Sequence, residues 1–312
     1  MSKVLMLIAI AANALGFGGI SKEIDRSNVD NSNLISINQI MDLPQIKIQP
    51  SLRDDHTDVT VAAQSYLLID EESGKVFAEK NANEKYSIAS TTKIMTAVIA
   101  LENYKLDDVV TVGTAPTLLP EVKTGLLKGE KISVLNLLKS MLIKSGNDSA
   151  NALAEYMNDK DEVGTKKFVD KMNAKARELN MVNTVYLDPV GLNDGGKSSS
   201  ADLVTIVKYA LKNETFANIV STNKETVSDT SGATKHDLQN TNLLLSQKYA
   251  GVIGVKTGFT GEAGHCLVSA VNRDGHTLIA VVLNTKTSTD QAPADESKKL
   301  YDWGFANIIW PN

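Results

Sequence analysis

Three short polar strings occur in a fixed order along this chain, each in a different predicted context. They are Ser90-Thr91-Thr92-Lys93, Ser145-Gly146-Asn147 and Lys256-Thr257-Gly258. The first begins a long apolar helical run, the second lies between two predicted helices, and the third lies in a predicted strand. One such string means little, but the ordered set in these contexts is a specific signal.

Local context also separates these strings from second copies elsewhere in the chain. Ser221 begins another S-x-x-K string, but in a polar stretch that no apolar helix follows. Lys123 begins another K-T-G string in turn-like sequence, which predicts a loop. We therefore expect the copies at Ser90 and Lys256 to be the functional ones.

The spacing of Ser90 and Lys93 suits a nucleophile and its base. A serine hydroxyl is a weak nucleophile that needs an adjacent base, and residues three apart share one helical face. The helix N-terminus also offers a partial positive charge where an oxyanion would form. Lys93 must be partly neutral to accept a proton, and burial beside a cation such as Lys256 would lower its pKa toward that state.

The other two strings suit substrate binding. Gly146 is a typical helix C-cap, so Ser145 and Asn147 should lie on a tight turn between helices, where they can relay a proton and bond a substrate amide. Lys256 and its neighbouring threonine offer a cation and a hydroxyl to a carboxylate, and Gly258 lets a ligand lie against the strand. Taken alone, the second string could also be an ordinary turn between two helices. Taken alone, the third could be a strand whose lysine only keeps an exposed sheet edge soluble.

Beyond these strings, the chain resembles the serine-type D-alanyl-D-alanine carboxypeptidases, low-molecular-mass penicillin-binding proteins of the penicilloyl serine transferase superfamily. The likeness extends from about Gln64 to Trp310. The segments that read like family sequence are Ile88–Ala97, Ser145–Asp148, Asn240–Leu244, Gly254–Thr260 and Ala263–Leu267.

The resemblance implies three catalytic residues and the groups that hold the substrate and the oxyanion beside them. Ser90 would be the nucleophile, Lys93 its base, and Ser145 would assist proton transfer. The backbone N–H groups of Ser90 and Phe259 would form the oxyanion hole, and Asn147 would hold the substrate.

The resemblance also implies the substrate. Lys256 and Thr257 would bind the terminal carboxylate of a peptidoglycan stem peptide ending in D-Ala-D-Ala, and Gly258 would belong to the same substrate-binding strand. β-Lactam antibiotics would be covalent inhibitors, and no metal or other cofactor would be needed. This carboxypeptidase activity would act outside the cytoplasm of a bacterium, in peptidoglycan biosynthesis and the control of cell shape.

Two relatives of the same fold remain as alternatives. A D,D-transpeptidase would pass the acyl group to an amine rather than to water. A β-lactamase needs a base that hydrolyses the acyl-enzyme, often a glutamate in a Glu-x-x-Leu-Asn string. The nearest string here begins with Ala176 in place of the glutamate, so we expect slow release of penicillin.

A remote alternative is a P-loop ATPase, because residues 191–198 match G-x-x-x-x-G-K-S letter for letter. Pro189 and only three residues, 185–187, stand where a buried strand should precede such a loop. The next helix should begin late, capped by Ser199 or Ser200. We therefore expect a loop. The start of this loop overlaps Asp188-Pro189-Val190-Gly191-Leu192, where many relatives of the resembled family read Asn-Pro-His-Gly-Leu.

Composition is that of a globular enzyme. The chain has 312 residues, 42% of them apolar, which is enough for a sizeable core. A net charge of −5 without a basic stripe argues against nucleic-acid binding. Four scattered histidines argue against catalytic zinc. The single cysteine, Cys266, lies in an apolar strand pattern and should be buried.

Three segments are expected. In residues 1–20, Lys3 precedes an apolar run, which suggests a signal peptide. The alternative is an uncleaved N-terminal anchor, and we expect membrane contact only through such an anchor. Residues 21–62 are polar and suggest a flexible linker. Residues 63–312 would form the enzyme domain, without a C-terminal β-domain.

The strand and helix patterns predict an α/β (α+β) fold. Strand patterns at both ends of the domain flank a largely helical middle. They suggest one antiparallel sheet flanked by helices, with an all-helical subdomain inserted at about 105–210. The resemblance implies the β-lactamase/transpeptidase-like version of this architecture.

Overall fold

The computed structural model describes residues 49–120, 122–157, 165–285 and 289–311. The predicted signal peptide or anchor and most of the predicted linker lie outside the described residues. The strands are β1 Ser51–Leu52, β2 Ser65–Asp70, β3 Val76–Lys80, β4 Tyr86–Ser87, β5 Val109–Thr111, β6 Lys131–Ser133, β7 Lys197–Ser198, β8 Lys224–Ser228, β9 Lys235–Gln239, β10 Val252–Thr260, β11 Gly264–Arg273, β12 His276–Thr285 and β13 Ile308–Ile309. The helices are η2 Ala89–Thr92, α3 Lys93–Asn103, α4 Thr114–Leu118, α5 Val134–Ile143, α6 Asn147–Glu155, α7 Lys166–Glu178, α8 Ser200–Ala210, α9 Glu214–Val220, α10 Leu243–Ser246 and α11 Ala292–Asn307.

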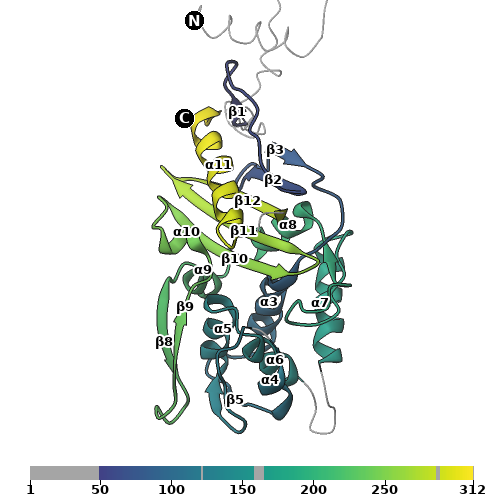
Figure 1. The fold of residues 1–312 in the computed structure, drawn as a ribbon, viewed down its shortest axis with the longest axis vertical. Coiled ribbons are helices and arrows are strands. Elements are labelled where there is room, and N and C mark those ends of the chain that lie inside the picture. Colours follow the sequence, from purple (N-terminus) through teal and green to yellow (C-terminus); the bar gives the residue numbers. More distant parts are fainter. Residues whose placement is uncertain (1–48, 121, 158–164, 286–288, 312) are drawn as a thin grey trace, which may run out of the picture. The chain divides into compact units, whose positions relative to one another are not determined.

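Five strands form an antiparallel sheet in the order β10-β11-β12-β2-β3 (Figure 1). β2 and β3 are the hairpin that the sequence predicts, and β10, β11 and β12 are the predicted C-terminal strands. Strands from both ends of the domain meet where Val281 of β12 lies opposite Leu67 of β2. β10, which carries Lys256, lies at an edge of the sheet and leaves one side open for a ligand.

The sheet is buried on both faces, and the sequence of β12 reflects this. Ile279 and Val281 belong to a large core shared with α3, α5 and α8, whereas Leu278 and Val282 belong to a smaller core under α11. Because neighbouring residues of a strand point to opposite faces, a strand covered on both faces needs a continuous apolar run. Buried residues of β11 belong to both cores, and Val255 of β10 belongs to the larger one.

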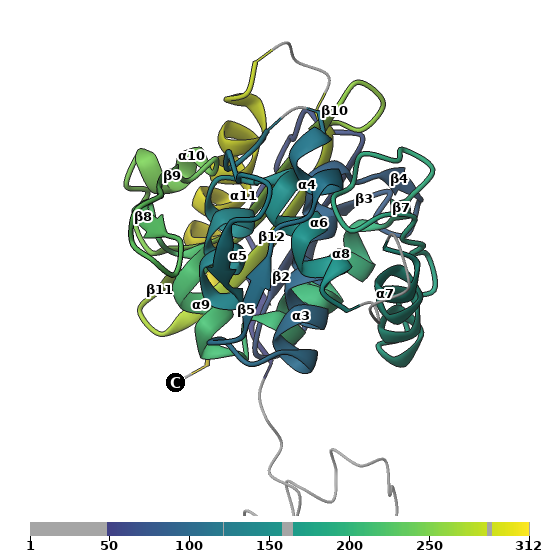
Figure 2. The same ribbon diagram turned by 90° about the horizontal axis from the view of Figure 1, so that it is seen from below.

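The chain between β3 and β10 carries most of the helices, and α3, α5 and α6 lie beside one another (Figure 2). The segment predicted as an inserted helical subdomain is largely helical and also contains short strands. β5 pairs with β6 inside it, with Val110 opposite Ile132, and β8 pairs with β9 after it. These strands have 3 to 5 residues, too few for an alternating pattern to stand out from a loop.

The predicted domain boundary at residue 63 is too late. β1 pairs with β13 at the end of α11, and Val61 is buried. The N–H of Ala62 donates a hydrogen bond of 2.8 Å to the carboxylate of Glu296. Residues 51–62 are therefore part of the folded domain, although their polar composition suggested a linker.

Within the described ranges, no helix has the length and apolar character needed to cross a membrane.

Candidate active site

Ser90 lies in η2, a turn of 3-10 helix that runs directly into α3. The first α-helical residue is Lys93, so the α-helix begins slightly later than the sequence predicts. Ala89 has a φ of 46°, in the left-handed region that non-glycine residues occupy mainly where their surroundings impose it. α3 is buried from Lys93 to Ala100, which fixes the position of the turn.

Lys93 is fully buried and makes three short contacts through Nζ. Its Nζ lies 2.6 Å from Ser90 Oγ, 2.8 Å from Asn147 Oδ1 and 2.8 Å from the carbonyl oxygen of Val190. The amine is thus held within hydrogen-bond reach of the hydroxyl, which is the geometry a general base needs.

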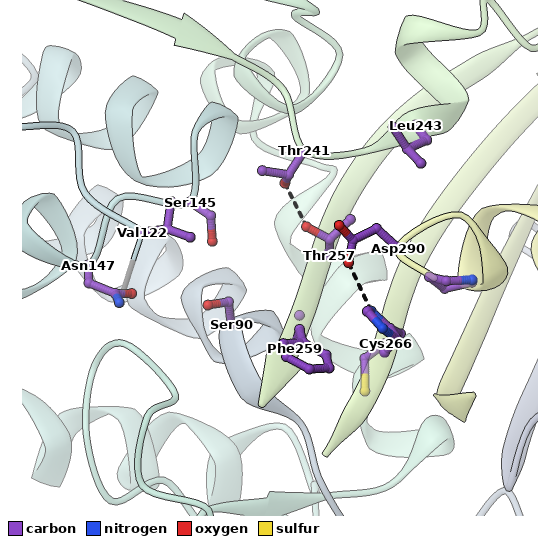
Figure 3. A pocket seen from close by; sticks show the side chains of 13 residues that line it. Ser90, Val122, Ser145, Asn147, Thr241, Leu243, Thr257, Phe259, Cys266 and Asp290 are labelled. Atoms are coloured by element: carbon purple, nitrogen blue, oxygen red, sulfur yellow. Dashed lines mark hydrogen bonds and ion pairs between the residues drawn. The ribbon is translucent and has the colours of Figure 1, made fainter. Parts of the chain in front are cut away.

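The turn between α5 and α6 brings Ser145 and Asn147 to the same place as Ser90 (Figure 3). The sequence predicts this turn correctly but not its backbone. Ser145, and not Gly146, has the left-handed φ, at 66°, and α6 begins at Asn147. The left-handed turn keeps the Ser145 hydroxyl beside the cleft.

The second K-T-G string, Lys123–Gly125, is a loop as predicted, and it supports this turn. The Asp148 carboxylate accepts hydrogen bonds of 2.8–3.1 Å from three backbone N–H groups at 124–126. A Cβ at Gly146 would lie 2.3 Å from Thr124 Oγ1, so glycine is what permits this close packing.

β10 brings Lys256 to the other side of the same turn. Lys256 Nζ lies 2.9 Å from Ser145 Oγ and 3.0 Å from the carbonyl oxygen of Thr257, and the side chain is buried. Burial, and next the charge of Lys93, lower the pKa of Lys256 well below its usual value of 10.5.

The backbone of β10 runs directly against the turn that carries Ser90. A Cβ at Gly258 would lie 2.9 Å from the carbonyl oxygen of Ile88 and 3.1 Å from the backbone nitrogen of Ser90. Thr257 and Phe259 alternate with Gly258 and line the cleft beside it. The strand and the serine turn therefore form two adjoining walls of one site.

These elements enclose a cleft of about 370 Å³ (Figure 3). Its lining residues are Ser90, Val122, Ser145, Asn147, Thr241, Leu243, Thr257, Gly258, Phe259, His265, Cys266, Asp290 and Pro293. Six of the eight predicted site residues are in this lining. The other two, Lys93 and Lys256, lie behind it and reach it through Ser90 and Ser145.

The sequence analysis missed several side chains of the cleft. The Thr241 hydroxyl lies 2.6 Å from that of Thr257, and the His265 ring stacks on Phe259 with centroids 4.4 Å apart. Asp290 lies 3.5 Å from His265 Nδ1 (Figure 3). Thr241 and His265 belong to segments that resemble the family and could have been found there, whereas no motif marks Asp290.

The remaining sequence candidates lie where the sequence predicts. Ser221 ends α9 and donates a hydrogen bond of 3.0 Å to the carbonyl oxygen of Asn218, outside the cleft. Residues 191–196 form a loop, and Ser199 caps α8. Cys266 is fully buried at the base of the cleft, and burial raises the pKa of its thiol to about 12.

Comparisons with known proteins agree with this geometry. Residues 52–287 match the peptidase S11 family, described as D-alanyl-D-alanine carboxypeptidase. The chain is 36% identical over 250 residues to the D-alanyl-D-alanine carboxypeptidase DacF of Bacillus subtilis, with 78% of this chain and 62% of that protein covered. It is also 36% identical over 258 residues to DacC of Escherichia coli, with 79% and 62% covered. The chain thus spans less than two thirds of the length of these two relatives.

A relative of more similar length is the D-alanyl-D-alanine carboxypeptidase of Streptomyces sp. strain K15, 36% identical over 265 residues, with 80% of this chain and 89% of that protein covered. The structure matches the crystal structure of the Streptomyces K15 DD-transpeptidase with a TM-score of 0.75 and 34% identity, over 80% of this chain and 99% of that one. The predicted fold class is confirmed. This chain belongs to the D-alanyl-D-alanine carboxypeptidase family.

Proposed function

We propose that this protein removes the terminal D-alanine from peptidoglycan stem peptides through a serine acyl-enzyme. The observation that carries the proposal is the 2.6 Å contact between Lys93 Nζ and Ser90 Oγ, in a cleft that is lined by Thr257 and has Lys256 directly behind Ser145. A base against a serine, beside a cation and a hydroxyl suited to a carboxylate, is the set that a carboxypeptidase of this kind needs.

In the proposed acylation, Ser90 Oγ attacks the carbonyl carbon of the penultimate D-alanine while Lys93 accepts its proton. The backbone N–H groups of Ser90 and Phe259 stabilise the oxyanion. Ser145, which lies between Lys256 and the cleft, gives its proton to the departing amine and receives in return the proton that Lys93 took from Ser90. The C–N bond breaks, and D-alanine leaves from an ester on Ser90.

In the proposed deacylation, water attacks this ester and restores the serine. Before the C–N bond breaks, Asn147 holds the substrate amide, and Lys256 with Thr257 holds the carboxylate of the terminal D-alanine. β-Lactams acylate the same serine and act as covalent inhibitors. With this substrate class, we expect the protein to act outside the cytoplasm of a bacterium, in peptidoglycan biosynthesis and the maintenance of cell shape.

Transpeptidation is the second candidate, and one observation favours it. The Streptomyces K15 protein is described both as a D-alanyl-D-alanine carboxypeptidase and as a DD-transpeptidase. The two activities share the acyl-enzyme and differ only in whether water or an amine resolves it.

The experiment that tests the proposal uses a synthetic peptide ending in D-Ala-D-Ala, with and without an amine acceptor, and reads the products by mass. A peptide shortened by one residue, with free D-alanine, is the result expected for the carboxypeptidase. A peptide joined to the acceptor as main product identifies the transpeptidase. No change in the peptide under either condition would contradict both.

A further inference from the structure

The loop from Asp188 to Lys197, called here the 188–197 loop, is pressed against the turn that carries Ser90. Gly191 has a φ of 83°, and a Cβ there would lie 1.9 Å from the carbonyl oxygen of Ala89. No other residue type fits without moving one of the two segments. The loop that matches a P-loop pattern by its letters therefore packs directly against the turn that carries Ser90.

Two carbonyl groups of this loop accept hydrogen bonds from buried side chains of α3. The Val190 carbonyl oxygen accepts from Lys93 Nζ at 2.8 Å, and the Pro189 carbonyl oxygen accepts from Thr96 Oγ1 at 2.6 Å. Lys93 and Thr96 are three residues apart and share one face of the helix. The loop is thus attached directly to the general base.

Asp188 organises the backbone that presents these carbonyls. Its Oδ1 accepts hydrogen bonds from the N–H groups of Val190, at 2.7 Å, and Gly191, and its Oδ2 accepts from that of Asn193 at 2.6 Å. One carboxylate therefore fixes three peptide groups. At the far end of the loop, the Asp194 carboxylate accepts from Thr260 Oγ1 of β10 at 2.5 Å.

The Val190 carbonyl matters because a base must present its lone pair to the proton it takes. A neutral lysine amine has two N–H bonds and one lone pair. If the oxygens of Asn147 and Val190 accept the two N–H bonds, the lone pair faces Ser90 Oγ. Without the Val190 acceptor, the amine can rotate and present an N–H to the serine instead.

We propose that Asp188 is a positioning residue for Lys93, acting through the carbonyl group of Val190. This inference rests on the proposed function, because it assumes that Lys93 accepts the proton of Ser90. It predicts that loss of Asp188 slows the chemical step of acylation without weakening the non-covalent binding that precedes it.

The test measures acylation by benzylpenicillin and separates the acylation rate constant, k2, from the dissociation constant of the preceding complex. Asp188→Ala should lower k2 by about 10- to 100-fold, the scale expected when a catalytic group is misplaced. The dissociation constant should stay within about twofold. Asp188→Asn should keep k2 within about threefold, because an amide oxygen can still accept from Val190 and Gly191.

Asp229→Ala is the matched control. Asp229 also holds a loop through its carboxylate, by bonds from the backbone N–H of Thr234 and the hydroxyl of Ser231, but in the turn between β8 and β9. The k2 of Asp229→Ala should equal that of the wild type. The proposal is wrong if Asp188→Ala leaves k2 at the wild-type value, as Asp229→Ala should. It is also wrong if Asp188→Ala changes both k2 and the dissociation constant and Asp188→Asn does not restore k2.

A second variant covers the case in which Asp188→Ala does not fold. Thr96→Val removes the hydroxyl that holds the Pro189 carbonyl oxygen and leaves the carboxylate in place. It should also lower k2 at an unchanged dissociation constant, and an unchanged k2 would overturn the proposal. A wild-type protein that benzylpenicillin does not acylate would instead contradict the proposed function itself.

Discussion

Lys93 and Lys256 approach the cleft from two sides, and each meets it through a serine. Lys93 contacts Ser90 and Lys256 contacts Ser145. Burial disfavours a charged amine, and a neighbouring cation disfavours it further, so the pKa of Lys256 is lowered. A bound carboxylate would favour the charged form again, so on this account the substrate restores the cation that binds it.

Replacing Lys256 should therefore distinguish substrates by their C-terminus. Lys256→Ala should lose a charge-assisted hydrogen bond worth about 1.5–3 kcal/mol with a free-acid peptide, or roughly 10- to 100-fold in kcat/KM. The loss on the matching C-terminal amide should be much smaller. Lys123→Ala in the second K-T-G string, whose Nζ contacts the carbonyl oxygen of Thr117, is the control. Equal losses on both peptides would show that Lys256 acts elsewhere.

The lowered pKa of Lys256 also predicts how stability depends on pH. The unfolded chain keeps this proton up to about pH 10.4, whereas the folded protein releases it at lower pH. Between these two values the unfolded state binds more protons, so this group makes the folded state more stable as pH rises. Lys256→Met should raise Tm by a few degrees below that window, and the gain should shrink toward pH 10. A gain that grows with pH would contradict the assignment.

At the scale of elements, the sequence predicts the helices and strands whose apolar pattern repeats over many residues. The β2–β3 hairpin, the C-terminal strands and the α5–α6 turn follow from alternation and helical spacing. The contacts of Thr241 and Val190 do not, because they arise where loops far apart in sequence meet. Ser145 shows a further limit, since a left-handed serine takes the place expected for Gly146.

The close approach of β10 to the serine turn gives a prediction for one glycine. Gly258→Ala would put a Cβ 3.1 Å from the backbone nitrogen of Ser90, so the strand or the turn must shift. A displacement near 1 Å can lower a rate by roughly 10²-fold. Gly261→Ala, a few residues along in the turn after β10, has open space for its Cβ and should acylate at the wild-type rate. Similar rates for the two variants, measured on folded protein, would contradict this packing.

At the scale of the whole domain, the cleft gathers side chains from the sheet edge, the serine turn and the helical segment. Among the described residues that line it, the one carboxylate belongs to Asp290, whose side chain is 93% exposed and lies beside His265. No glutamate is in that lining. Ala176, which replaces the glutamate of the β-lactamase string, is buried in the core on α7.

This arrangement predicts slow deacylation of penicillin. A tethered β-lactam ring blocks water where no positioned base activates it, whereas a peptide acyl group is free once D-alanine has left. We expect the penicilloyl adduct to last at least minutes, measured by intact mass over time, while the peptide turns over repeatedly. Loss of the adduct within seconds, with hydrolysed drug far beyond one equivalent, would identify a β-lactamase instead.

The central claim is that Ser90 is the nucleophile, and labelling with a fluorescent penicillin tests it most directly. The wild type should carry the label on Ser90 by peptide mapping, and Ser90→Ala should lose the label together with roughly 10³-fold or more of the peptide turnover. Undiminished labelling of Ser90→Ala, or a label mapped to Ser221, would contradict the account.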